Sequence, residues 1–194
     1  MSLLHSPSHP SAAHPPSPLP LPLLRVQPLR ERPELIPELQ AWFQAEWPGY
    51  YGPGGPGDAR RDLLAYAQPD PAALPLGLVA LQTDAKGSDG IERLCGFAAI
   101  KTEPFAPCPG LGPWAGAALV PQALRRQGIG LLLLQALVSE ARALYRHQTR
   151  HPTTLFCATA TSDSLMLRAG WRLRERVMHG GGEVRVYEVG VAAD

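Results

Sequence analysis

Two arginines and two glycines stand close together in the second half of the chain, at Arg125, Arg126, Gly128 and Gly130. They follow an apolar segment that predicts a strand, and they begin the stretch of sequence with the clearest helical periodicity. Glycine lets the backbone approach a ligand closely, and the first turn of a helix offers unpaired N–H groups at the positive end of the helix dipole. Together with the two arginine charges, this spacing predicts a binding site for a pyrophosphate group.

Other nucleotide-binding motifs fit this segment less well. A dinucleotide fingerprint G-x-G-x-x-G needs a glycine where Leu133 stands, and a P-loop needs a lysine directly after its last glycine, which neither Gly128 nor Gly130 has. The glycine-rich run 52–57 contains prolines, which lack the N–H groups that phosphate binding needs. Taken by itself, the 125–130 turn is equally compatible with an ordinary helix start that carries two incidental arginines.

The segments around this turn must hold it in place, and their periodicity indicates a fold class. Short or alternating apolar runs between turn residues predict strands, and apolar residues at helical spacing predict helices. We expect strands at 24–26, 76–82, 94–101, 114–120, 155–159, 171–178 and 184–191, and helices at 34–46, 59–67, 128–146 and 162–169. Hairpins around 84–90 and around 180–182 join most of these strands, which indicates an α+β fold with a mixed sheet.

Two segments resemble motifs of the GNAT superfamily of N-acetyltransferases. Residues 125–130, RRQGIG, fit its R/Q-x-x-G-x-G/A motif between the fourth strand and the third helix. Residues 165–171, LMLRAGW, resemble its x-Y-x-x-x-G-F/W segment, which precedes a strand hairpin. The resemblance extends over roughly residues 23–191. It implies a mostly antiparallel, seven-stranded sheet that is splayed between strands 4 and 5 and flanked by about four helices.

The resemblance implies acetyl-CoA as the co-substrate, held in a V-shaped gap between the fourth and fifth strands. Amides of the turn would cradle the pyrophosphate, and backbone groups at the end of the fourth strand would pair with pantetheine. One amide there would also polarise the thioester carbonyl as an oxyanion hole. The acetyl-CoA contacts implied in this way are Ala118, Leu119, Val120, Arg125, Arg126, Gln127, Gly128, Ile129, Gly130 and Leu131. No metal is expected.

Acetyl transfer to an amine needs a proton acceptor, because an alkyl amine with a pKa of about 10 is charged at neutral pH. The family often uses a carboxylate on the fourth strand, but the expected fourth strand holds none, so Glu46 and Glu103 are the candidate bases. The family's general acid is usually a tyrosine four residues before the glycine. Met166 stands at that position and cannot donate a proton. Ser164, Tyr145 or a water molecule is the candidate replacement.

An aromatic segment lies between the first two expected helices, where the resemblance places the acceptor. Trp47, Tyr50 and Tyr51 belong to an expected loop, 46–57, that is dense in glycine and proline. Aromatic side chains in a loop are less often explained by core packing than those in a helix or strand. An aromatic wall beside Glu46 suits a cationic amine through cation–π and charge attraction. We therefore expect these three aromatic residues to bind the acceptor.

Composition divides the 194 residues into two parts and argues against several classes of protein. Residues 1–22 hold seven of the 22 prolines and no charged side chain, which indicates a disordered tail before a domain at 23–194. The formal net charge of +1 argues against a nucleic-acid binder, and no apolar stretch is long enough to cross a membrane. Three cysteines without C-x-x-C spacing favour a reducing, cytoplasmic location over a disulfide framework or a zinc site.

The resemblance implies an N-acetyltransferase that moves the acetyl group of acetyl-CoA to a primary amine of a small molecule or peptide. The amine would attack directly, through a tetrahedral intermediate, and the protein would be a monomer or a homodimer. The alternative is a non-catalytic acyl-CoA-binding regulatory module, because Met166 and the acid-free fourth strand depart from the family pattern.

Overall fold

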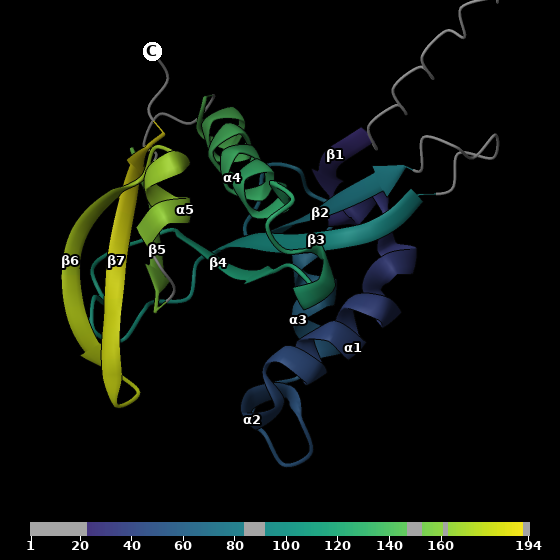
Figure 1. The fold of residues 1–194 in the computed structure, drawn as a ribbon, viewed down its shortest axis with the longest axis horizontal. Coiled ribbons are helices and arrows are strands. Elements are labelled where there is room, and N and C mark those ends of the chain that lie inside the picture. Colours follow the sequence, from purple (N-terminus) through teal and green to yellow (C-terminus); the bar gives the residue numbers. More distant parts are fainter. Residues whose placement is uncertain (1–22, 84–91, 147–152, 161–162, 192–194) are drawn as a thin grey trace, which may run out of the picture.

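One sheet of seven strands runs through the computed structural model, which describes residues 23–83, 92–146, 153–160 and 163–191 (Figure 1). The strands are β1 (Leu23–Pro28), β2 (Leu76–Thr83), β3 (Glu92–Lys101), β4 (Trp114–Leu119), β5 (Thr154–Thr159), β6 (Arg172–His179) and β7 (Gly182–Gly190). Their order is β1-β2-β3-β4-β5-β7-β6, and every neighbouring pair is antiparallel except β4 with β5. The expected α+β class with a mostly antiparallel sheet is confirmed.

Within the described part of the chain, five α-helices flank the sheet: α1 (Ile36–Glu46), α2 (Pro48–Tyr51), α3 (Ala59–Tyr66), α4 (Ile129–Tyr145) and α5 (Asp163–Arg168). The expectation of a continuous loop at 46–57 is wrong, because α2 forms one helical turn inside it. Proline fits the first position of a helix, since its fixed φ suits the helix and its missing N–H needs no partner there. Short 3₁₀ turns also form at Leu29–Glu31, Pro33–Leu35 and Gln122–Leu124.

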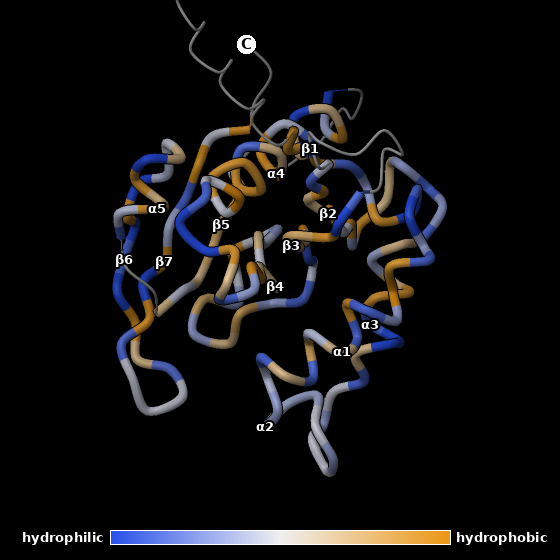
Figure 2. The backbone as a smooth tube through the Cα atoms, turned by 45° about the vertical axis from the view of Figure 1, so that its right-hand side comes forward, coloured by the Kyte–Doolittle hydropathy of each residue, from blue (hydrophilic) through white to orange (hydrophobic). Residues whose placement is uncertain are grey.

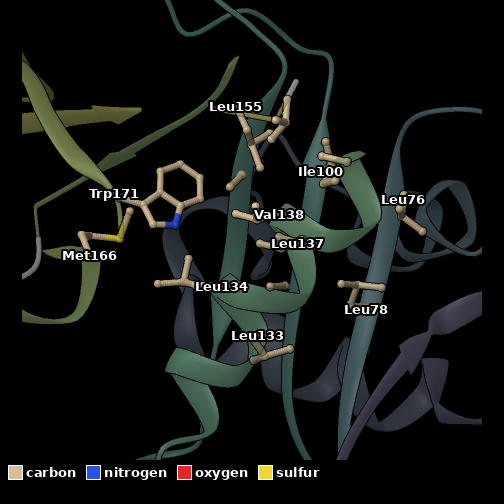
Figure 3. Packing of buried hydrophobic residues seen from close by; sticks show 14 of the residues in the cluster. Leu76, Leu78, Ile100, Leu133, Leu134, Leu137, Val138, Leu155, Met166 and Trp171 are labelled. Carbon is tan, nitrogen blue, oxygen red and sulfur yellow. The ribbon is translucent and has the colours of Figure 1, made fainter. Parts of the chain in front are cut away.

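Helices cover both faces of the sheet, and each face has its own apolar core. α4 lies against one face, where Leu78, Leu133 and Leu137 are buried together (Figure 3). α1 and α3 lie against the other face, around Phe43 and Phe97. Alternate residues of β2 and β3 point to opposite faces, so both strands read as almost continuous apolar runs. The outer strand β6, by contrast, is exposed and largely hydrophilic (Figure 2).

Strand β4 contains a β-bulge. Phe97 of β3 pairs with Leu119, but Ala99 pairs with Gly116, so β4 has one residue more than β3 between these pairs. Ala117 lies in the bulge and has a φ of +49°, in the left-handed region. Because a bulge interrupts the regular ladder, it turns backbone N–H and C=O groups out of their usual direction.

Strands β4 and β5 separate soon after they begin to pair. Among the described residues, ladder pairs join only Trp114 with Phe156 and Ala115 with Cys157, whereas β5 stays paired with β7 up to Thr159. The two strands run in clearly different directions in Figure 1. The splay expected between strands 4 and 5 is therefore present, and it leaves one backbone edge of β4 without a neighbouring strand beyond the second pair.

The hairpin between β6 and β7 turns at Gly180 and Gly181, as the glycine run predicts. Their φ values of +59° and +82° lie in the left-handed region that a two-residue hairpin turn favours. The expected turn at 84–90 and the expected tail at 1–22 lie outside the described residues. Of the helices that the structure describes, none combines the length and the apolar composition that crossing a membrane requires.

Trp171 fills the apolar core between α4 and α5, and replacing it should destabilise the fold. Its side chain is 2% exposed and lies between Met166 and α4 (Figure 3). Trp171→Ala leaves a cavity, so we expect the free energy of unfolding to fall by about 3–5 kcal/mol in urea titrations followed by circular dichroism. Leu167→Ala, on the exposed side of α5, should lower it by about 0.5 kcal/mol or less. Equal losses in the two variants would contradict this packing role.

Candidate functional site

The turn before α4 has the backbone form of an anion-binding site. Arg126 and Gly128 both have left-handed φ values, +65° and +85°, and Gly128 is the N-cap of α4. No side chain of the described residues caps this helix, so its first-turn amides are available to a ligand at the positive end of the dipole. A Cβ on Gly128 would meet no atom within 4 Å, so the glycine is required by the backbone conformation and not by crowding.

A glycine in β3 fixes the start of α4 on the sheet. A Cβ on Gly96 would lie 2.9 Å from Ile129 Cγ2 and 2.9 Å from Leu133 Cδ1, closer than atoms in contact normally approach. Both side chains are buried under the first two turns of α4. The first turns of α4 therefore pack directly on β3, which places the turn before α4 next to the end of β4.

Arg125 fastens this turn to two other elements. Its Nε donates a hydrogen bond to Val120 O at 3.0 Å, and its Nη2 donates to Glu46 Oε1 at 3.3 Å. These bonds join the end of β4, the turn and the end of α1. Arg125 therefore braces the turn, although both it and the neighbouring Arg126 are exposed.

A cavity of about 480 Å³ lies beside the aromatic segment, within the size range of small-molecule sites. Its lining comes from the end of α1, α2, α3 and the end of β3: Trp47, Tyr50, Tyr51, Arg61, Asp62, Lys101 and Glu103. The structure thus brings all three residues expected to bind the acceptor together with one of the two candidate bases. It also adds three charged residues, from α3 and β3, that no motif in the sequence indicates.

The aromatic wall of this cavity is anchored on both sides. The Trp47 ring meets the fully buried Phe43 ring edge-on at 5.0 Å between centroids, and the Tyr51 ring lies 5.4 Å from Phe43. The Tyr51 hydroxyl donates a hydrogen bond to Asp62 Oδ2 at 3.0 Å. Burial and the nearby Asp62 carboxylate raise the pKa of Tyr51, so the hydroxyl stays protonated and keeps this bond at neutral pH.

Lys101 connects the cavity with the bulged strand. A Cβ on Gly116 would lie 3.2 Å from Lys101 Cδ, so the lysine stem crosses β4 over a residue without a side chain. Gly116 is the residue directly before Ala117 in the bulge. Lys101 Nζ lies 3.9 Å from Glu103 Oε2. Glu103 therefore stands close to the place where β4 leaves β5.

The other candidate groups for proton transfer do not line this cavity. Glu46 is absent from its lining and is paired with Arg125. Ser164 is exposed on α5, and its backbone carbonyl accepts a hydrogen bond from Arg168 Nε at 3.2 Å. Met166, at the position of the family's tyrosine, is buried in the α4 core. Of the candidate bases and acids, Glu103 is the group that shares a cavity with the aromatic wall.

Tyr145 belongs to a second cavity, of about 350 Å³, between the last turn of α4 and the segment before β4. Burial raises the pKa of Tyr145 to about 12. The 17 residues of α4 separate Tyr145 from the anion-binding turn, which corresponds to about 25 Å at the helical rise. None of the residues expected to bind the acceptor lines this second cavity.

The described residues offer neither a metal site nor a reactive thiolate. Within the described ranges, no group of three or more His, Cys, Asp or Glu side chains could hold a metal ion. Cys95, Cys108 and Cys157 are all free. Burial raises the pKa of Cys157 to about 12, so this thiol next to the splay is neutral at pH 7 and a poor nucleophile.

Comparisons with known proteins bear on the fold. No protein-family model and no curated protein matches the sequence. Among solved structures, the chain is similar to an acetyltransferase of the GNAT family from Streptococcus pneumoniae, with 16% identity, a TM-score of 0.53, and coverage of 88% of this chain and 99% of that one. It is also similar to YncA from Salmonella typhimurium, solved with its cofactor acetyl-CoA, with 13% identity, a TM-score of 0.55, and coverage of 90% and 96%.

A third similar structure is the aminoglycoside acetyltransferase AAC(6')-Ib in complex with coenzyme A and kanamycin. Its identity is 14% and its TM-score 0.55, and the match covers 87% of this chain and 95% of that one. Structural neighbours across nearly the full length are thus acetyltransferases, one of them of the GNAT family. The fold of this chain is GNAT-like, as the sequence motifs indicate.

Proposed function

We propose that this protein is an acetyl-CoA-dependent N-acetyltransferase that acts on a primary amine of a small molecule or peptide. The observation that carries the proposal is the uncapped start of α4 at the end of β4, beside the gap between β4 and β5. An anion-binding turn and a free strand edge next to each other suit the pyrophosphate and the pantetheine of one coenzyme A molecule. YncA, a structural neighbour solved with acetyl-CoA, supports this assignment.

In this proposal, backbone groups of the chain do most of the binding. Residues 126–131 hold the pyrophosphate, and residues 118–120 pair with pantetheine as if with an added strand. Arg125, the residue directly before the first of these segments, holds the second one in place, because its side chain bonds to Val120 O and to Glu46 at the end of α1. The bulge at Ala117 turns a backbone N–H towards the thioester carbonyl, where negative charge develops during the reaction.

Glu103 is the proposed general base. It accepts one proton from the ammonium of the acceptor, and the neutral nitrogen then attacks the thioester carbonyl carbon. As the N–C bond forms, the bulge amide stabilises the negative carbonyl oxygen; as that oxygen reforms the carbonyl, the C–S bond breaks. The second proton leaves the nitrogen through water and neutralises the thiolate. Water takes this part because Met166, at the family's tyrosine position, is buried and has no proton to donate.

An amine panel tests the proposal against its alternative. The protein is mixed with acetyl-CoA and with amines that include amino acids, polyamines, aminosugars and peptides, and free thiol is measured over time. We expect thiol release that depends on the amine and on the protein. Tight acetyl-CoA binding without thiol release for every amine would instead favour an acyl-CoA-binding regulatory module, the alternative to which Met166 and the acid-free β4 point.

Trp47→Ala should weaken acceptor binding and leave the chemistry intact. The ring lines the cavity beside Tyr51, so its loss should raise the KM of the acceptor about tenfold, which corresponds to about 1.4 kcal/mol of lost contact. The kcat should change little, because the ring contacts the ground state and the transition state alike. Tyr51→Phe, which removes the bond to Asp62, should raise the same KM by a smaller factor. Steady-state kinetics that show an unchanged acceptor KM in both variants would contradict the aromatic wall.

A further inference from the structure

The acceptor cavity holds charges of both signs, and the carboxylates of its two ion pairs differ in how many partners they already have. Asp62 accepts a hydrogen bond from the Tyr51 hydroxyl at 3.0 Å and lies 3.5 Å from Arg61 Nε, so its carboxylate already interacts with two partners. Lys101 Nζ and Glu103 Oε2 are 3.9 Å apart, which is too long for a hydrogen bond. Glu103 is therefore the carboxylate of this cavity with more capacity left for a ligand, and the Lys101 ammonium lies beside it without a hydrogen bond to it.

Lys101 is also well placed to act on a bound acceptor. Its stem crosses Gly116 beside the bulge, where the thioester carbonyl is proposed to lie. Its side chain is 31% exposed, whereas that of Arg61 is 70% exposed, so water screens the Lys101 charge less. Lysine is rare in this chain, with two residues among 18 Lys and Arg. Its ammonium is a compact charge with three donors, which suits one carboxylate group.

The ligand that fits this pair carries an ammonium and a carboxylate close together. A polyamine would place a second positive charge against Lys101, and the N-terminus of a peptide would place a neutral amide there. A free α-amino acid carries both groups on one carbon atom, so its ammonium can face Glu103 while its carboxylate faces Lys101. Its side chain would then lie against the rings of Trp47 and Tyr51, which line the same cavity.

We propose, building on the proposed function, that the acceptor is a free α-amino acid with an aromatic or apolar side chain and that Lys101 selects for its carboxylate. The test compares L-phenylalanine with phenethylamine, which lacks the carboxylate, as acceptors of the wild-type protein and of Lys101→Met. We expect the kcat/KM for L-phenylalanine divided by that for phenethylamine to fall about tenfold or more in Lys101→Met. A loss of this size corresponds to the removal of one charge-assisted hydrogen bond to the carboxylate. Comparing ratios cancels the different intrinsic reactivities of the two amines.

Arg61→Met is the matched control, because it removes a positive charge from the same cavity at a more exposed position. Its ratio should stay within about twofold of the wild-type ratio, since an exposed ion pair contributes little. An unchanged ratio in Lys101→Met, or an equal fall in both variants, overturns the inference. Acetyl-CoA affinity measured by calorimetry should match the wild-type value in both variants, which shows that they fold.

The two proposals fail in different ways. A wild-type protein that acetylates other amines of the panel, but neither L-phenylalanine nor phenethylamine, overturns the amino-acid inference and leaves the acetyltransferase proposal standing. A wild-type protein that acetylates phenethylamine as well as L-phenylalanine, with no effect of Lys101→Met on the ratio, does the same. A protein that binds acetyl-CoA and acetylates no amine at all overturns both.

Discussion

Gly128→Asp should lower the affinity for acetyl-CoA by about a hundredfold or more, which corresponds to about 2.7 kcal/mol or more of binding free energy. Two effects act together. Gly128 has a φ of +85°, where a residue with a Cβ is strained. The new carboxylate would also stand at the uncapped start of α4, where it can accept hydrogen bonds from the first-turn amides and repel the pyrophosphate. Isothermal titration calorimetry without acceptor measures this loss directly.

Gly181→Asp is the matched control for backbone strain. Gly181 has a φ of +82°, almost that of Gly128, and a Cβ there would also meet no atom within 4 Å. It lies in the hairpin between β6 and β7, so the same substitution introduces similar strain and the same charge away from α4. Its acetyl-CoA affinity should stay within about threefold of wild type, a change of less than about 1 kcal/mol. Wild-type affinity in Gly128→Asp would remove the basis for the pyrophosphate site.

Local patterns in the sequence are sufficient to predict most of the helices and strands of the fold. The period of apolar residues predicts a helix at 128–146, and α4 spans Ile129–Tyr145. Glycines predict the turn between β6 and β7 because that turn needs left-handed φ values, which is a property of the residues themselves. α2 is different: it is a single turn without periodicity, and it packs through Tyr51 and the neighbouring Trp47 on Phe43. Tertiary contacts of that kind leave no pattern in the local sequence.

The two halves of the candidate site also differ in how far the local sequence predicts them. The anion-binding turn consists of consecutive residues, 125–130, so a motif can reveal it. The acceptor cavity combines residues from three separate segments, and the place of Lys101 depends on its crossing over Gly116 in the neighbouring strand. The sequence also leaves Glu46 and Glu103 equivalent as bases. The structure separates them, because Glu103 lines the cavity whereas Glu46 is paired with Arg125 beside the turn.

Glu103→Gln should lower kcat about a hundredfold to ten-thousandfold at neutral pH, the range that a positioned general base contributes. The amide keeps the size of the side chain but cannot accept the proton of the acceptor ammonium. Glu46→Gln is the matched control, because Glu46 is paired with Arg125 and does not line the cavity. It should raise the KM of acetyl-CoA a few-fold, by weakening the brace at an exposed ion pair, and should leave kcat within about twofold of wild type.

The pH dependence distinguishes a base from a residue that only shapes the cavity. At pH 7 an alkyl amine with a pKa of about 10 is almost entirely protonated, so the base is needed; near pH 10 half of the amine is already neutral. The kcat/KM of Glu103→Gln should therefore rise about tenfold for each pH unit between pH 7 and pH 9, and its deficit relative to wild type should shrink over the same range. A deficit that stays constant from pH 7 to pH 9 would mean that Glu103 positions the acceptor without taking its proton. An equal loss of kcat in Glu46→Gln would mean that lining the cavity does not distinguish the base from the other candidate.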